Sequence, residues 1–80
     1  MKIRLNFVAL DVDSFPGKGL HELDLKEGAN VVDALLALGL EEDTFFLTLL
    51  NESSVPRTLR NATKLNEGDT LTLFYPIKGG

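Results

Sequence analysis

A single short helical segment stands between stretches in which polar and apolar residues alternate, and this limits the fold more than any other feature of the sequence. Asn30 can cap the helix with its side-chain oxygen, Asp33 suits the positive end of the helix dipole, and Gly39 can end the helix in a left-handed conformation. A helix of about two and a half turns is unstable alone in water, so we expect it to pack against a sheet. Its apolar stripe consists of Val31, Val32, Leu35, Leu36 and Leu38.

Two strands are predicted before the helix. Residues 2–9 and residues 20–26 both alternate polar with apolar side chains, which is typical of half-buried strands. Residues 10–19 between them contain the turn-forming run 15–17, so the two strands should form a hairpin with a long loop. One face of the first strand carries Ile3, Leu5, Phe7 and Ala9, and one face of the second carries His21, Leu23 and Leu25.

Residues after the helix predict further strands and a crossover. Residues 45–50 are apolar on both faces, with Thr48 as the exception, which favours a strand in the sheet interior. Pro56 has no backbone N–H and would confine a short strand at residues 55–57 to an edge. Residues 58–66 contain few apolar side chains, so we expect a surface crossover with one helical turn.

The last predicted strand follows a tight turn at residues 67–69 and runs from Thr70 to about residue 75. Its alternation directs Leu71 and Leu73 toward the core and leaves Phe74 exposed on the opposite side. The order of elements therefore predicts an α+β fold in which one main helix packs on one face of a sheet.

Composition excludes several classes of function. Eighty residues suffice for one small domain, and a formal net charge of −4 at pH 7 gives no electrostatic footprint for nucleic acid. The absence of cysteine excludes disulfides, thiolate metal sites and a catalytic thiol, and we expect no metal and no cofactor. His21 lacks an obvious partner and is interpreted as a strand residue. Residues 1–7 do not resemble a signal peptide or a membrane span, so the default expectation is a cytoplasmic protein without a membrane partner.

The final residues form a tail. Pro76 should end the last strand, which predicts a folded domain at residues 1–75 and a flexible tail at residues 76–80. Gly79 and Gly80 have no side chains, so the tail tip could enter a slot too narrow for other residues. The reactive group that such a tip would deliver is the carboxylate of Gly80.

The element order and the sequence of the last strand and tail resemble the ubiquitin-like β-grasp sulfur carriers of the MoaD and ThiS family. The resemblance rests on residues 65–69 (LNEGD) followed by residues 71–80 (LTLFYPIKGG). It implies a mixed sheet of about four or five strands under one helix. It also implies that an E1-like ATP-dependent enzyme adenylates the Gly80 carboxylate and that sulfur then displaces AMP to give a thiocarboxylate.

The same resemblance assigns roles to the other tail residues and to the partners. The chain would be a non-catalytic co-substrate that passes its sulfur to a large catalytic subunit or a synthase. Partner docking would involve Phe74, Tyr75 and Pro76, and the tail that enters the partner would comprise Ile77, Lys78 and Gly79.

Three roles within this resemblance stay open. Residues 74–77 are similar to the aromatic and proline run of molybdopterin-synthase small subunits, and we favour that role in molybdenum or tungsten cofactor synthesis. Residues 55–57 are similar to the sulfur carriers of thiamin biosynthesis, which supply sulfur for synthesis of the thiazole of thiamin. The third alternative is a ubiquitin-like modifier whose Gly80 forms isopeptide bonds with lysines. Cysteine synthesis and tRNA thiolation are further pathways that the resemblance leaves open.

Overall fold

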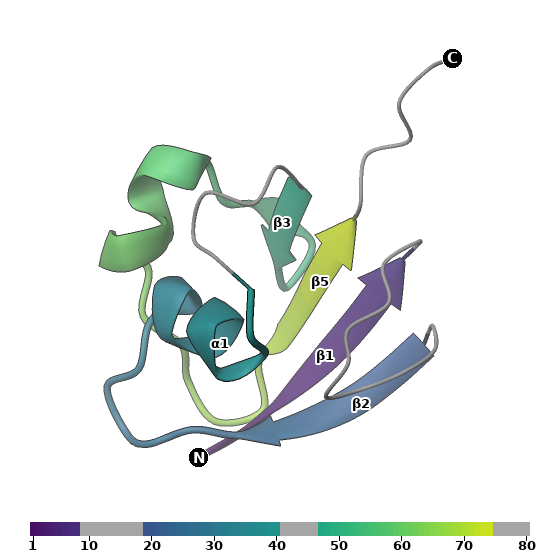
Figure 1. Ribbon diagram of the computed structural model, residues 1–80, viewed down its shortest axis with the longest axis vertical. Helices are drawn as coiled ribbons and strands as arrows, with labels where there is room; N and C mark the ends of the chain where they lie inside the picture. The colour runs from purple at the N-terminus through teal and green to yellow at the C-terminus, as the bar shows by residue number, and fades with distance from the viewer. Residues whose placement is uncertain (9–18, 41–46, 75–80) are drawn as a thin grey trace.

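The computed structural model describes residues 1–8, 19–40 and 47–74, and these form a five-stranded sheet with helix α1 across one face (Figure 1). The predicted α+β class is confirmed. Along the chain the elements are β1 (Lys2–Val8), β2 (Gly19–Asp24), α1 (Val31–Ala37), β3 (Leu47–Leu50), β4 (Ser53–Ser54), the 3₁₀ helix η1 (Arg57–Ala62) and β5 (Thr70–Phe74).

The sheet is mixed, and its order is β2-β1-β5-β3-β4. The first and last strands, β1 and β5, lie side by side in the middle and run parallel, from the pair Arg4 and Thr70 to the pair Val8 and Phe74. The other neighbouring strands are antiparallel, and β3 places Leu47 beside Phe74. This is the ubiquitin-like β-grasp arrangement, in which α1 lies in the connection between the β1–β2 hairpin and the β3–β4 hairpin.

The hydrophobic core lies between α1 and the sheet. One side-chain parity of each central strand faces the helix, as the alternation predicted, and the predicted helix stripe is confirmed except at its flank, where Leu36 is 57% exposed. Ala34 takes the buried place on the helix instead, because it lies between Val31 and Leu38 on the same side. The buried core residues are Ile3, Leu5, Phe7, Val31, Ala34, Leu35, Leu38, Val55, Leu65, Leu71 and Leu73.

Both ends of α1 are capped as the sequence predicted. The Asn30 side chain accepts a hydrogen bond from the Asp33 N–H, and the Asp33 side chain accepts one from the Asn30 N–H, each at 2.9 Å. At the other end, Gly39 has a φ of +80°. Its N–H donates to the Leu36 carbonyl at 3.0 Å, and the Leu40 N–H donates to the Leu35 carbonyl at 2.9 Å, which is a Schellman motif.

The short edge strand lies earlier than predicted. Residues 55–57 do not form it, because the β3–β4 hairpin turns at Asn51 and Glu52 and its second strand is Ser53–Ser54. Pro56 instead precedes η1, where its lack of an N–H costs nothing. The predicted crossover is confirmed and contains η1.

Some predictions lie outside the described residues. These are the position of Ala9, the loop at residues 10–18, the start of the third strand at residues 45–46, and the tail at residues 75–80. No helix in the described part of the chain is both long enough and apolar enough to cross a membrane.

Candidate functional site

The sheet ends where β5 leads into the final residues. Phe74 is the last residue of β5, and it lies between Val8 of β1 and Leu47 of β3. Phe74 is half-buried rather than exposed, because both neighbouring strands flank it on the same face. The expected parity is nevertheless correct, since Leu71 and Leu73 point to the opposite face and are buried.

The sheet face away from α1 has an apolar end around Phe74. Strand register places side chains of four strands on this face, and two of them, Leu20 and Leu47, are 68% and 49% exposed. Their neighbours are half-buried. We call this group the apolar patch, and it consists of Val8, Leu20, Leu47, Leu49 and Phe74.

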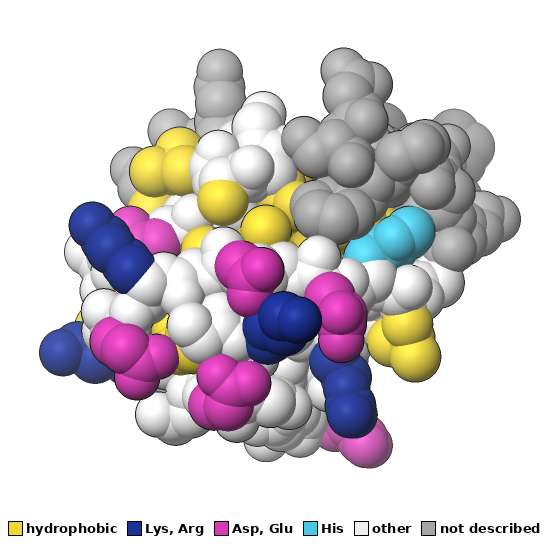
Figure 2. Space-filling view, turned by 90° about the horizontal axis from the view of Figure 1, so that it is seen from below, with side chains coloured by type: hydrophobic (Ala, Val, Ile, Leu, Met, Phe, Trp, Pro, Cys, Tyr) yellow, Lys and Arg dark blue, Asp and Glu magenta, His cyan; other side chains and the backbone are white. Residues whose placement is uncertain are grey.

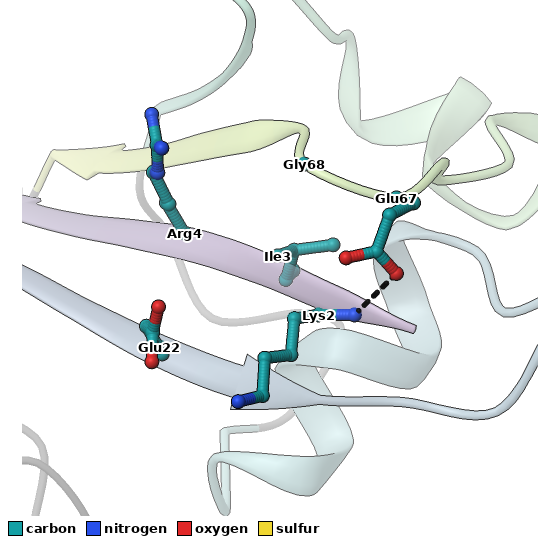
Figure 3. Close-up of a pocket in the computed structure, with 6 residues that line it drawn as sticks. All are labelled: Lys2, Ile3, Arg4, Glu22, Glu67 and Gly68. Carbon is teal, nitrogen blue, oxygen red and sulfur yellow. Dashed lines mark hydrogen bonds between the residues drawn. The ribbon is translucent and has the colours of Figure 1, made fainter.

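The turn before β5 is bonded to the start of β1. The Gly68 N–H donates to the Lys2 carbonyl, and the Arg4 N–H donates to the Asp69 carbonyl, both at 2.8 Å. The Glu67 side chain accepts a hydrogen bond from the Lys2 N–H at 2.9 Å (Figure 3). Gly68 has a φ of +82°, a conformation that glycine adopts without strain. The turn predicted at residues 67–69 is thus confirmed, and it fixes the register of β5 against β1.

Asn51 fixes the same turn to β3. Its side-chain Nδ2 donates to Asp69 Oδ1 at 3.0 Å, and its Oδ1 accepts from the Thr70 N–H at 2.9 Å. Its own N–H donates to the Thr70 carbonyl at 2.8 Å. Sequence reasoning missed this contact, because the partners lie in the turn before β5 and at its first residue, eighteen and nineteen residues further on.

A hollow of about 140 Å³ opens beside this turn, at the end of the sheet opposite to Phe74. Figure 3 shows side chains of both signs around it, with Arg4, Glu22 and Lys2 on the two neighbouring strands. Figure 2 shows acidic and basic side chains intermingled over this end of the molecule. The hollow therefore offers no preference for an anion or a cation.

Comparison with known proteins identifies the family. Residues 13–80 match the sequence pattern of the ThiS family, and this range includes β5 and the final glycines. The chain belongs to the ThiS family. No curated protein matches its sequence at a significant level.

Solved structures similar to this ThiS-family chain come from several related proteins. SAMP1, the small archaeal modifier protein 1 of Haloferax volcanii, is 26% identical with a TM-score of 0.73, and the match covers 100% of both chains. A putative molybdopterin converting factor subunit 1 of Pyrococcus furiosus is 19% identical with a TM-score of 0.71, covering 96% of this chain and 99% of that chain. The thiamine biosynthesis protein ThiS of Geobacter metallireducens is 25% identical with a TM-score of 0.63, with coverage of 96% and 99%.

The structure places one predicted site residue of this ThiS-family chain, Phe74, at the apolar patch. The other predicted site residues, Tyr75, Pro76, Ile77, Lys78, Gly79 and Gly80, lie outside the described residues. Among the residues that are described, no group of histidine and acidic side chains could hold a metal ion. His21 lies in β2 with its ring centroid 5.2 Å from that of Phe7.

Arg60 is a buried charged residue that sequence reasoning missed. It lies in η1 and is 3% exposed, and desolvation together with the nearby Arg57 lowers the pKa of its guanidinium. Its burial follows from the packing of η1 against α1, and neither hydrophobic periodicity nor a motif signals it. We assign it a structural role in η1, which packs beside α1.

Proposed function

We propose that this protein is a sulfur carrier whose Gly80 carboxylate is the reacting group. An E1-like enzyme would bind ATP, and a carboxylate oxygen of Gly80 would attack the α-phosphorus and expel pyrophosphate. A hydrosulfide sulfur supplied by the activating system would then attack the acyl carbon and expel AMP. The resulting thiocarboxylate would pass its sulfur to a synthase or a large catalytic subunit.

Membership of the ThiS family carries this proposal, since the match runs from residue 13 to residue 80 and so includes Gly79 and Gly80. The family to which the chain belongs comprises small ubiquitin-like carriers or modifiers, which are generally non-catalytic. The proposed chemistry needs no catalytic side chain in the carrier, because the ATP-dependent enzyme activates the carboxylate. In this proposal residues 1–75 are the folded domain, residues 76–80 are a flexible tail, and both act in the cytoplasm.

Docking to the partner enzymes is assigned to the apolar patch and the residues that follow it. Phe74 lies at the centre of the patch, and the proposal adds Tyr75 and Pro76 as its continuation. Exposed apolar groups beside a functional terminus favour binding, because their burial on a partner releases water. Ile77, Lys78 and Gly79 would then lead the Gly80 carboxylate into the active site of the partner.

Two pathways are proposed for the sulfur. We favour molybdopterin synthesis, in which the chain would be the small synthase subunit, because of the aromatic and proline residues at 74–77. Synthesis of the thiazole of thiamin is the alternative pathway, and the 25% identity to the ThiS protein of Geobacter metallireducens supports it. Incubating the thiocarboxylate form with either the large molybdopterin-synthase subunit or the thiazole synthase distinguishes them, since only the correct enzyme would turn over.

A second candidate function is protein modification. The similarity to a small archaeal modifier protein, at 26% identity over the whole of both chains, favours it. Both functions begin with the same adenylate and differ in the group that displaces AMP. A lysine amine would give an isopeptide bond, whereas sulfur would give the thiocarboxylate.

Mass spectrometry of the intact protein from its native cells tests both candidates. A carrier is expected to show the mass increase of one sulfur-for-oxygen exchange, which alkylation of the thiocarboxylate would confirm. A modifier is expected in conjugates with other proteins, linked through Gly80. Protein with neither change, recovered from cells that contain the active E1-like enzyme, would refute the proposal.

A further inference from the structure

The outer side of β2 is an unpaired sheet edge within the described part of the chain. Met1 and Leu25 exchange backbone hydrogen bonds in both directions, at 2.6 and 2.8 Å. Bonded and non-bonded pairs alternate along an antiparallel ladder, so Leu20, Glu22 and Asp24 direct their N–H and C=O groups away from β1. These backbone groups form a row that an additional strand could bond.

The side chains of this edge have a distinct pattern. Leu20, Glu22 and Asp24 share the face away from α1, and all three are exposed. Arg4 and Lys2 lie opposite the two acids on β1, yet the ion pairs formed among the described residues include none of these four side chains. The carboxylates of Glu22 and Asp24 are thus available to a charge that approaches from the outer side.

We propose that the outer edge of β2 is a β-addition site for an extended protein segment with basic side chains at alternate positions. Main-chain hydrogen bonds to Leu20, Glu22 and Asp24 supply the affinity, and the side chains supply the selectivity. Cross-strand opposite charges attract and like charges repel, so the two acids reject acidic strands and favour Lys or Arg. An apolar residue of the segment would lie against Leu20.

This site is separate from the proposed chemistry at Gly80 and does not depend on it. Leu20 belongs both to the edge and to the apolar patch, so a segment added to β2 would extend the same sheet face on which we place the partner enzymes.

The first test uses a synthetic peptide of alternating valine and lysine, about as long as β2. The peptide is titrated into the isotope-labelled protein while its amide signals are followed by NMR. We expect saturable shifts and slowed hydrogen exchange at the amides of Leu20, Glu22 and Asp24. Shifts that leave these three amides unchanged would overturn the proposal, as would equal binding of an alternating valine and glutamate peptide.

Matched neutral variants separate the edge from the general charge of the protein. The double change Glu22→Gln and Asp24→Asn is compared with Glu27→Gln and Glu52→Gln, which removes the same charge at exposed turn positions outside β2. We expect the edge variant to bind the lysine peptide about three- to tenfold more weakly and the control to change less than about twofold. Equal weakening of both variants would contradict the proposal.

A third test concerns the backbone itself. Two further peptides carry N-methyl groups, one on its lysine amides and the other on its valine amides. An added strand turns alternate amides toward β2, so one peptide should lose binding while the other keeps it within about twofold. Loss of binding in both peptides or in neither would show that the segment does not add to the sheet.

Discussion

At the scale of single residues, the turn between β3 and β4 uses two left-handed positions without glycine. Asn51 and Glu52 have φ values of +50° and +70°. Such a two-residue turn suits the twist of a hairpin and favours the sequence Asn-Gly. The backbone strain at Asn51 is offset by its side-chain hydrogen bonds to Asp69 and Thr70. The side chain of Glu52 is exposed and makes no such contact among the described residues.

The substitution Glu52→Gly is therefore expected to stabilise the protein by about 1 kcal/mol, because glycine adopts a positive φ without strain. The measurement is the free energy of unfolding from urea denaturation. Asn51→Gly is the matched control, since it relieves the same kind of strain but removes the side-chain hydrogen bonds, and it should destabilise the protein. A loss of stability in Glu52→Gly would show that its side chain makes an important contact.

Phe74→Ala should separate stability from binding. Because the ring is half-buried, we expect a loss of about 1–2 kcal/mol in the free energy of unfolding, compared with about 2–5 kcal/mol for the fully buried neighbour in Leu73→Ala. Affinity for the E1-like enzyme should fall in Phe74→Ala. Unchanged affinity, measured by calorimetry on the folded variant, would remove Phe74 from the proposed docking surface.

At the scale of elements, the turn at residues 66–69 joins three strands. It bonds to β1 through Lys2 and Arg4 and to β3 through Asn51, while Asp69 Oδ2 accepts a hydrogen bond from the Asn66 N–H at 2.7 Å within the turn itself. These contacts fix where β5 begins, and hence the position of Phe74 at its end.

Asn51→Ala should destabilise the protein by about 1–3 kcal/mol, because it removes two side-chain hydrogen bonds and leaves the Thr70 N–H without its acceptor. Combined with Asp69→Ala in a double-mutant cycle, it should show a coupling energy of about 0.5–2 kcal/mol. The measurement is equilibrium unfolding of all four proteins. Asn61→Ala serves as a control at an exposed position, and additive effects of the two changes would argue against a direct link.

Elements with one buried face were predictable from the sequence, and so were the helix caps. Alternation located β1, β2 and β5, and Asn30 and Gly39 bounded α1, because these signals depend on neighbours in the sequence. The position of β4 was not predictable, since a strand of two exposed serines has no hydrophobic pattern. Thr48 and Thr72 were also missed as buried residues, because their burial depends on which strand lies beside them.

The candidate site was predictable only in outline. The parity of Phe74 followed from the alternation of β5, whereas the predicted tail lies outside the described residues. The apolar patch could not be predicted from the sequence. Val8, Leu20 and Leu47 come from three strands, and sequence reasoning did not assign the order of these strands in the sheet.

Thr48 gives a further prediction that sequence reasoning could not have made. Its hydroxyl is fully buried and has no hydrogen-bond partner among the described residues. Thr48→Val keeps the shape and removes the unpaired polar group, so we expect stability to rise by about 1 kcal/mol. Thermal unfolding measures the effect, with Thr70→Val as a control at a more exposed position; a clear destabilisation would show that the hydroxyl is bonded.

At the scale of the whole molecule, the sheet face away from α1 has two unlike ends. The apolar patch lies at the end where β5 finishes. Mixed charges surround the hollow at the other end, and Figure 2 shows acidic and basic side chains intermingled there. A partner that covers this face would bury apolar area near the end of β5 and meet charges further away. Affinity should then depend on the apolar end, and orientation on the charged end.

Gly79→Val tests whether the tail must enter a narrow slot. A β-branched side chain adds width and restricts the backbone, so adenylation should be blocked while the free energy of unfolding is unchanged. Lys78→Val is the matched control, because residue 78 already carries a side chain, and it should remain active. Adenylate formation is measured over a wide range of carrier concentration, and recovery of the full rate of the unaltered protein at saturation would refute the slot.

The parallel pairing of β1 with β5 has a consequence for biosynthesis. Among the described strands, β1 is synthesised first and β5 last, and the two lie side by side in the middle of the sheet. The side of β1 that pairs with β5 therefore has no partner until residues 70–74 have been synthesised. A nascent chain that ends before β5 leaves β1 without its neighbour on the inner side and lacks Leu71 and Leu73 from its core. We therefore expect the sheet to be completed only once β5 exists, so that a partner of the kind proposed above, which would recognise the folded face, would bind only chains that contain β5.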